Sequence, residues 1–135
     1  MADENMFGPI DVSVSGMDAF SQSMGQIYKN IANARTVDAG NGLPYRRVEL
    51  LLKQRVDDEL GGVEVDKVVP DRSPFSQIYD PNHPYADGNG YVRMPNVSIP
   101  KEMINLTIAT RAYQANVAVL RRYQQMVDST LELLR

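Results

Sequence analysis

Apolar residues recur every three or four positions near the N-terminal end of the chain, with polar residues between them. From about Ile10 to Arg35 this spacing predicts an amphipathic helix of roughly 25 residues. Several Ser and Gly residues in this stretch lower its intrinsic helix propensity, so we expect the helix to need a partner surface. Its predicted apolar seam consists of Met17, Phe20, Met24, Ile27, Ile31 and Ala34.

The same pattern predicts a longer helix at the other end, from about Pro100 to Arg135, which would span about 50 Å. Pro100 suits the first turn of this helix, and Lys101 and Glu102 are expected to begin its polar face. Thr110 and Gln124 interrupt an otherwise apolar seam. That seam comprises Ile99, Met103, Leu106, Thr110, Tyr113, Val117, Leu120, Gln124, Val127, Leu131 and Leu134.

Residues 40 to 100 contain Gly and Pro at a density that helices do not tolerate, so this stretch is predicted to form strands and loops. The expected strands are Tyr45 to Lys53, Val63 to Val69, Phe75 to Tyr79 and Tyr91 to Met94, with a turn at 87–90. The predicted fold class is mainly α with a small β insert. Residues 1–42 and 101–135 would pack as a coiled-coil-like helical hairpin, with 43–100 as a β-rich outer lobe.

Composition limits the possible functions. With 135 residues the chain suits one domain, and its net charge of −3 argues against a nucleic-acid partner. No segment is apolar enough to cross a membrane, and the acidic N-terminus lacks the apolar region of a cleavable secretory signal. The chain has no Cys, which excludes disulfides, thiolate metal sites and cysteine nucleophiles.

Charge differs between the two ends of the chain. The formal charge is −3 over residues 1–42 and +2 over residues 101–135. Opposite signs would allow the ends to lie against each other or against neighbouring copies.

Catalytic motifs are absent from the sequence, and we expect neither enzymatic activity nor a cofactor. His83 is the only histidine, and with Asp80 and Asp87 it could suggest a metal site. These residues occupy a Pro-rich stretch without a second His or Cys, so a surface loop is the preferred interpretation.

The two predicted helices differ in length by roughly ten residues, so part of the longer seam has no partner within a simple hairpin. Spacing alone does not distinguish an intramolecular core from a seam shared between subunits. We predict a subunit interface formed by Met17, Phe20, Met24, Ile27, Ile31, Met103, Leu106, Tyr113, Val117, Leu120, Val127 and Leu131.

Several motifs resemble those of bacterial flagellar rod and hook proteins. Residues 30–36 (NIANART) with 44–47 (PYRR) are similar to the N-terminal signature of this family, and 102–105 (EMIN) with 111–117 (RAYQANV) to its C-terminal signature. Central motifs at 73–75, 79–84 and 90–97 resemble its proximal-rod members; a short loop between Lys53 and Gly61 departs from them. The resemblance singles out Asn30, Asn33, Tyr45, Arg111, Gln114 and Asn116.

The resemblance implies a structural subunit of the rod, which crosses the periplasm and transmits torque around a central export channel. It implies as partners other copies of the chain, other proximal- and distal-rod proteins, a rod-base adaptor and the flagellar type III export apparatus. Export would proceed without a cleaved signal peptide. Asn30, Asn33, Gln114 and Asn116 would hydrogen-bond between subunits and fix their register, or else cap helices and face solvent. Alternatives are a soluble helical adaptor or export chaperone, and a small enzyme using His83.

Overall fold

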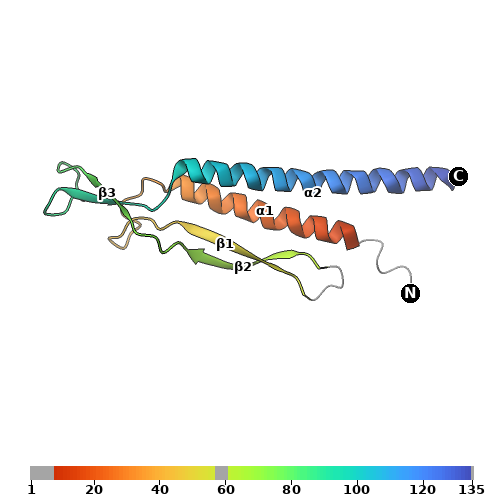
Figure 1. The fold of residues 1–135 in the computed structure, drawn as a ribbon, viewed down its shortest axis with the longest axis horizontal. Helices are drawn as coiled ribbons and strands as arrows, with labels where there is room; N and C mark the ends of the chain where they lie inside the picture. The colour runs from red at the N-terminus through yellow and green to blue at the C-terminus, as the bar shows by residue number, and fades with distance from the viewer. Residues whose placement is uncertain (1–7, 57–60, 135) are drawn as a thin grey trace.

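Two long helices form an antiparallel hairpin in the computed structural model, which describes residues 8–56 and 61–134 (Figure 1). Helix α1 (Gly8–Ala32) and helix α2 (Ile99–Leu133) are separated in sequence by strands β1 (Val48–Gln54), β2 (Val63–Pro70), β3 (Ser76–Tyr79) and β4 (Tyr91–Met94). The predicted mainly helical fold with a small β insert is thereby confirmed. The division into segments 1–42, 43–100 and 101–135 stays a prediction.

Helix α2 begins at Ile99, with Pro100 in the first turn and Ser98 in extended conformation before it. Proline is favoured there because its missing N–H would have no partner within the helix. α2 has 35 residues and α1 has 25, and Figure 1 shows α2 continuing beyond the described part of α1. The difference in length between the two predicted helices is confirmed.

The insert forms two separate antiparallel strand pairs. β1 pairs with β2, with an irregularity between Leu51 and Leu52, and β3 pairs with β4. The β1–β2 ribbon lies along α1, whereas β3–β4 extends beyond the start of α2 (Figure 1). α1 is therefore the middle element, packed against α2 on one side and against the ribbon on the other.

Two local predictions in the insert have different outcomes. The turn at 87–90 is confirmed: Asp87 Oδ1 accepts the Asn89 and Tyr91 N–H groups, both at 2.9 Å, and Gly90 has a φ of 81° beside Tyr79. The first strand begins later than expected, at Val48 instead of Tyr45. The Tyr45 N–H donates to the Thr36 carbonyl at 3.0 Å, so it is not available to a neighbouring strand.

Few apolar side chains are buried in the described residues. They are Ala19, Ile27, Val92 and Ala109. Many larger apolar side chains are exposed, especially along α2. In the described part of the chain, neither helix is long and apolar enough to cross a membrane. The interior within one copy is therefore small, and it is partly polar, because Asn30, Arg47 and Glu102 are also buried.

Candidate functional site

Polar side chains meet where the end of α1, the approach to β1 and the first turn of α2 come together. They are Asn30 from α1, Tyr45 and Arg47 from the segment before β1, and Glu102 from α2. We call these four residues the polar centre. Asn30, Arg47 and Glu102 are 1%, 5% and 0% exposed, respectively, and Tyr45 is half-buried. Buried polar groups of this kind are stable only when their hydrogen bonds are satisfied.

Asn30 connects all three elements of the polar centre. Its Oδ1 accepts hydrogen bonds from the Tyr45 hydroxyl at 3.0 Å and from the Val48 N–H at 3.1 Å. Its Nδ2 donates to the Val48 carbonyl at 2.9 Å and to Glu102 Oε2 at 3.1 Å. The amide therefore holds the first residue of β1 and the first turn of α2 to the end of α1.

Arg47 and Glu102 form a buried ion pair, with Arg47 Nε 2.6 Å from Glu102 Oε1. Arg47 Nη1 also contacts the carboxylates of Glu49 and Asp71, the second at 3.4 Å. One guanidinium thus contacts carboxylates from β1, from α2 and from the segment that follows β2. A buried pair of this kind gives little net stability over an apolar pair, but loss of one partner leaves an uncompensated charge.

The electrostatics agree with this geometry. Burial alone would lower the pKa of Arg47, but hydrogen bonds to Glu49 and Glu102, with their negative charge, outweigh burial and raise it. Burial raises the pKa of the Tyr45 phenol, with a further increase from the nearby charge of Glu102, against a lowering by Gln26. Both groups are therefore held in their protonated forms, Arg47 as a cation and Tyr45 as a neutral donor.

A second set of bonds attaches the insert to this centre. Asn96 Oδ1 accepts the Arg47 N–H at 2.8 Å, and Asn96 Nδ2 donates to the Asp71 carbonyl at 3.1 Å. Arg46 Nη1 donates to the same carbonyl at 2.8 Å, and its guanidinium lies 4.2 Å from the Phe75 ring centroid. Hydrogen bonds from Ser73, and more weakly the Arg47 charge, lower the pKa of Asp71. The strand pairs are thus connected to the helices through polar contacts.

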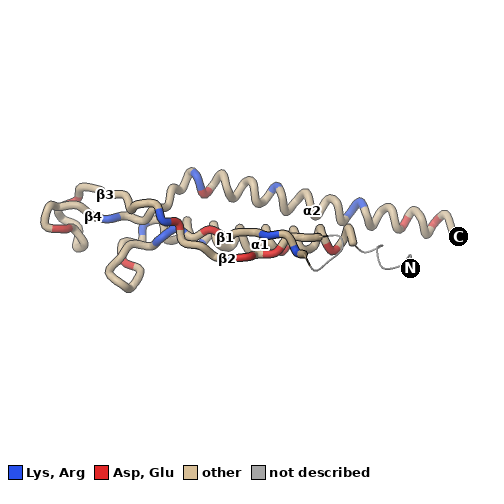
Figure 2. Tube along the Cα trace, turned by 60° about the horizontal axis from the view of Figure 1, so that its bottom comes forward, with Lys and Arg blue, Asp and Glu red and all other residues tan. Residues whose placement is uncertain are grey.

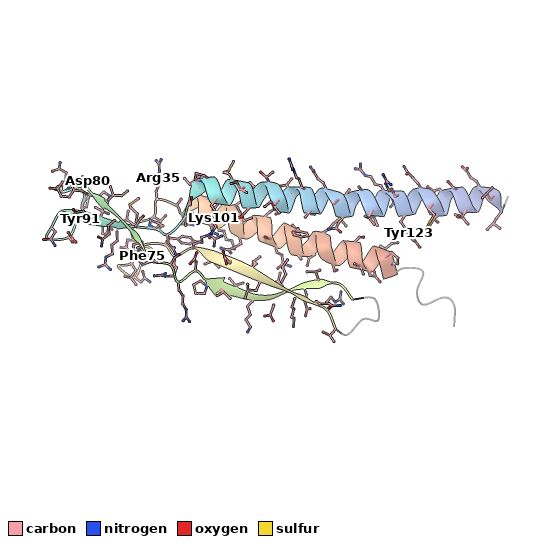
Figure 3. The ribbon with its side chains drawn as sticks, in the orientation of Figure 1. Arg35, Phe75, Asp80, Tyr91, Lys101 and Tyr123 are labelled. Atoms are coloured by element: carbon pink, nitrogen blue, oxygen red, sulfur yellow. The ribbon has the colours of Figure 1, made fainter. Side chains whose placement is uncertain are left out.

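Small residues allow α1 and α2 to approach closely along the rest of the hairpin. Ser13, Gly16 and Ala19 are all buried on α1. A Cβ atom on Gly16 would lie 2.9 Å from Asn116 Nδ2 of α2. Further along, Thr110 Oγ1 lies 3.5 Å from Met24 Sδ, so successive contacts run in antiparallel order toward the polar centre. Figure 3 shows Tyr123, which is half-buried, on the side of α2 that faces α1.

The residues predicted to form a subunit interface fall into three groups. Ile27 is buried, and Met103 and Leu131 are 51% and 60% exposed. The others are half-buried, namely Met17, Phe20, Met24, Ile31, Leu106, Tyr113, Val117, Leu120 and Val127. Half-buried side chains contact other residues of their own copy and still have surface available to a second copy. Their role in subunit contacts therefore stays a prediction.

The family-motif residues are divided between the interior and the surface. Asn30 and Tyr45 belong to the polar centre. Asn33 Nδ2 donates to the Lys29 carbonyl at 2.9 Å and Asn116 Nδ2 to the Ala112 carbonyl at 3.1 Å, both local contacts along the chain. Arg111 and Gln114 are exposed on α2. Hydrogen bonding between subunits therefore remains a prediction chiefly for Gln114, because the amides of Asn30, Asn33 and Asn116 bond within the chain.

The expectation that Glu102 begins the polar face of the last helix is wrong. Glu102 is fully buried, whereas Met103 is 51% exposed. The predicted seam contains the apolar Met103, whereas the structure buries Glu102, one position earlier. Counting back from Leu106 and Ala109 in steps of four and seven leads to position 102, so the spacing held the signal. Arg47 was part of a motif, but nothing in its spacing indicated a partner 55 residues away.

The stretch considered as a metal site folds as a set of turns. His83 Nδ1 accepts the Tyr85 N–H at 3.2 Å, and Asp80 Oδ1 accepts the Asn82 N–H at 3.3 Å. Figure 3 places Asp80 and Tyr91 at the β3–β4 end of the molecule. Among residues 8–56 and 61–134, no group of three His, Cys, Asp or Glu side chains could hold a metal ion.

An open cavity of about 240 Å³ lies beside the polar centre, between α1, β1 and α2. Phe20 and Ile108 contribute apolar walls, while Gln26 and Asn105 contribute amides. Glu102 and Arg47 also line it, but their bonds to each other occupy them. The polar centre therefore holds segments of the chain together, and its charged groups, Arg47 and Glu102, bond to each other beside the cavity.

Comparison with known proteins gives a consistent result. The family model described as flagellar basal body rod FlgEFG protein, C-terminal, matches residues 89–133. The chain is 38% identical to the flagellar basal-body rod protein FlgC of Yersinia enterocolitica over 125 residues, covering 91% of this chain and 93% of the relative.

Two further relatives have the same description. FlgC of Agrobacterium fabrum is 39% identical over 127 residues, covering 92% of this chain and 91% of the relative. FlgC of Borreliella burgdorferi is 34% identical over 149 aligned positions, covering 96% of this chain and 98% of the relative. Because these matches run through the helices, the insert and the polar centre, the chain belongs to the FlgC family of flagellar basal-body rod proteins.

Proposed function

We propose that this protein is a structural subunit of the flagellar basal-body rod and assembles through its terminal helices. The observation that carries the proposal is an apolar face on α2 in addition to the one packed on α1. Ile104, Ile108, Val119 and Met126 are 62%, 60%, 49% and 57% exposed, respectively. Their spacings of four, eleven and seven residues bring them to one side of the helix. An apolar stripe of this length is typical of a surface covered by another protein.

The polar centre supports a role that transmits force. It connects α1, the approach to β1 and α2 by short bonds among residues that are almost fully buried. Because an interior of this kind does not deform gradually, each copy would transmit load without separation of its helices from the insert. This is the property that a torque-transmitting shaft requires of its subunits.

The detailed placement is also a proposal. Residues 1–42 and 101–135 would form the axial core around an export channel, and residues 43–100 an outer layer. The rod would cross the periplasm and receive the chain through the flagellar type III export apparatus. Its partners would be other copies, other proximal- and distal-rod proteins and the adaptor at the rod base. Support comes from family membership and from the exposed face of α2.

The experiment is complementation of a strain that lacks its own copy of this gene. We expect the native chain to restore rods and swimming, and Ile104→Glu with Ile108→Glu to abolish both. The matched control is Val68→Glu on the outer face of β2, which has similar exposure at 59% and should assemble normally. Circular dichroism of each purified chain establishes that it is folded. Normal rods containing the folded double variant would contradict the proposal.

No observation favours the alternative of a soluble helical adaptor or export chaperone. The relatives that match over nine-tenths of the chain are named rod proteins. The same holds for an enzyme using His83, whose Nδ1 takes part in a turn.

A further inference from the structure

Two helix faces on opposite sides of the molecule are complementary in charge. On α1, Asp11 and Asp18 lie seven residues apart with Val14 between them, so the three side chains share one face. This face borders an open groove of about 790 Å³ against the β1–β2 ribbon, which is also lined by Val63 and Val65 of β2. The groove lies on the side of α1 that faces away from α2, since Gly16 and Met24 make the contacts with α2.

The second face is on α2. Arg111 and Arg122 lie eleven residues apart, about 16 Å along the axis and on the same side of the helix. Ala115 and Val119 lie between them, and all four are exposed. This is the side of α2 opposite to its contact with α1, because Thr110, Asn116 and Ala109 occupy the inner side.

Among residues 8–56 and 61–134, the aspartates of the α1 face and the arginines of the α2 face form no ion pair. In the described part of the chain, Asp11 and Asp18 form no ion pair, although Asp18 Oδ2 accepts a hydrogen bond from Gln22 at 2.9 Å. Arg111 and Arg122 form none there either. Glu64, at the edge of the groove, is paired with Lys53, and Arg55 adds one positive charge to the lining. The unpaired charge is thus negative on α1 and positive on α2.

Figure 2 shows how charge is arranged along the molecule. Lys and Arg lie at intervals along α2, with acidic residues at its start and toward its C-terminal end, whereas acidic residues lie along α1 and the ribbon with basic residues among them. The antiparallel contacts place the Arg111–Arg122 stretch of α2 alongside the N-terminal half of α1, where Asp11 and Asp18 lie. The two faces are therefore at the same level along the long axis, on opposite edges.

We propose that the α1–ribbon groove of one copy receives the Arg111–Arg122 face of α2 from a second copy. Val14, Val63 and Val65 would pack against Ala115 and Val119, with the aspartates and arginines pairing on either side. In each copy the α1–ribbon groove and the Arg111–Arg122 face of α2 lie on opposite edges. The contact is therefore heterologous, and it propagates from copy to copy instead of closing as a dimer. This inference rests on the proposed function, and it specifies which surfaces meet.

The first test is charge reversal with rescue in the complementation strain. Asp11→Arg with Asp18→Arg, and separately Arg111→Asp with Arg122→Asp, should each lower the yield of rods about tenfold, because two ion pairs become repulsive. The chain with all four substitutions should regain most of the yield. If circular dichroism shows that the fourfold variant is folded but its yield of rods does not recover, the proposed contact between the groove and α2 is refuted.

The second test uses the absence of Cys from the native chain. Two single-cysteine chains, Val14→Cys and Val119→Cys, are expressed together, and isolated basal bodies are oxidised. We expect a disulfide-linked product with the mass of two copies. The matched control replaces the first chain by Val68→Cys, whose side chain is similarly exposed on β2. Equal cross-linking by the control, or a product with a different rod protein, would refute a second copy as the occupant.

The two proposals fail in distinguishable ways. If rods contain the chain but the Val14→Cys and Val119→Cys chains give no cross-linked product, the proposed groove contact is contradicted and the proposed rod function is not. Basal bodies that lack the native chain altogether contradict the rod function itself.

Discussion

The guanidinium Nε of Arg47 lies 2.6 Å from Oε1 of Glu102, and their side chains are 6% and 0% exposed. The two residues are 55 positions apart in sequence, and their bond joins the start of the insert to the first turn of α2. Asn30 bonds the same carboxylate from α1 through its other oxygen. Glu102 is thereby the residue through which the three segments of the chain contact one another.

Removal of the charge on Glu102 should destabilise the fold. Glu102→Gln leaves Arg47 buried without its closest buried countercharge, and we expect the free energy of unfolding to fall by about 3 kcal/mol. Urea denaturation of the purified chain, followed by circular dichroism, measures this. The control is Glu49→Gln, which removes a carboxylate that also contacts Arg47 but is 49% exposed, and should cost less than about 1 kcal/mol. Equal losses in the two variants would show that burial is not the cause.

Asn30 provides a second test of the polar centre. Asn30→Ala removes the bonds to both backbone groups of the half-buried Val48 and the bond to the buried Glu102 carboxylate, so we expect a loss of about 2 kcal/mol or more. The matched control is Asn33→Ala one turn later, where the side chain bonds only to nearby residues and is less buried. A loss there of less than about 1 kcal/mol is expected. If both variants unfold at the same urea concentration, the connecting role of Asn30 is refuted.

The two glycines inside α1 should respond oppositely to substitution by alanine. A Cβ added to Gly25 would meet nothing within 4 Å, so Gly25→Ala should raise the free energy of unfolding by about 0.5–1 kcal/mol through helix propensity. A Cβ on Gly16 would lie 2.9 Å from Asn116 Nδ2, so Gly16→Ala must displace that side chain. We therefore expect no increase in the free energy of unfolding for Gly16→Ala.

Asn116→Ala should restore the gain at Gly16 by removal of the clashing amide. Thermal unfolding of the single and double variants checks this coupling. Gly16→Ala that stabilises as much as Gly25→Ala in the native background would show that the helices separate easily at this point.

The helices could be predicted because their signals are local. Proline at position 100 and the spacing of apolar residues are sufficient to define α2, and its observed start at Ile99 is one residue from the prediction. The turn at 87–90 was predictable for the same reason, since Asp87 and Gly90 determine it within a few residues. The class of the fold followed from these local patterns.

The contacts between segments were less predictable because they depend on size and charge more than on periodicity. Of the large apolar residues in the predicted seam of α1 the structure buries Ile27, and it also buries Ser13, Gly16 and Ala19, which permit close approach of α2. In the sequence, Ser13 and Gly16 indicated only weak helix propensity. Glu102 was assigned to the surface because an isolated carboxylate avoids the interior, and only its distant partner Arg47 makes burial possible.

Tyr45 links stability to pH in the alkaline range. Its pKa in the folded chain is raised, first by burial, whereas an unfolded tyrosine titrates near about 10. Below that pH both states keep the proton, and the phenol contributes its full stabilisation. Above it the unfolded chain loses the proton first, so stability should fall as pH rises toward the folded pKa.

Tyr45→Phe tests this dependence because it removes the titrating group and the hydrogen bond to Asn30 at 3.0 Å. At neutral pH we expect the variant to be less stable than the native chain by about 1 kcal/mol. That difference should shrink as the pH rises above about 10, where the unfolded phenol begins to ionise, because the native chain alone is weakened by ionisation of this phenol. Urea titrations at a series of pH values measure it, with Tyr28→Phe, at 58% exposed, as the control expected to match native stability at neutral pH. A difference that stays constant across the range would show that the phenol ionises equally in both states.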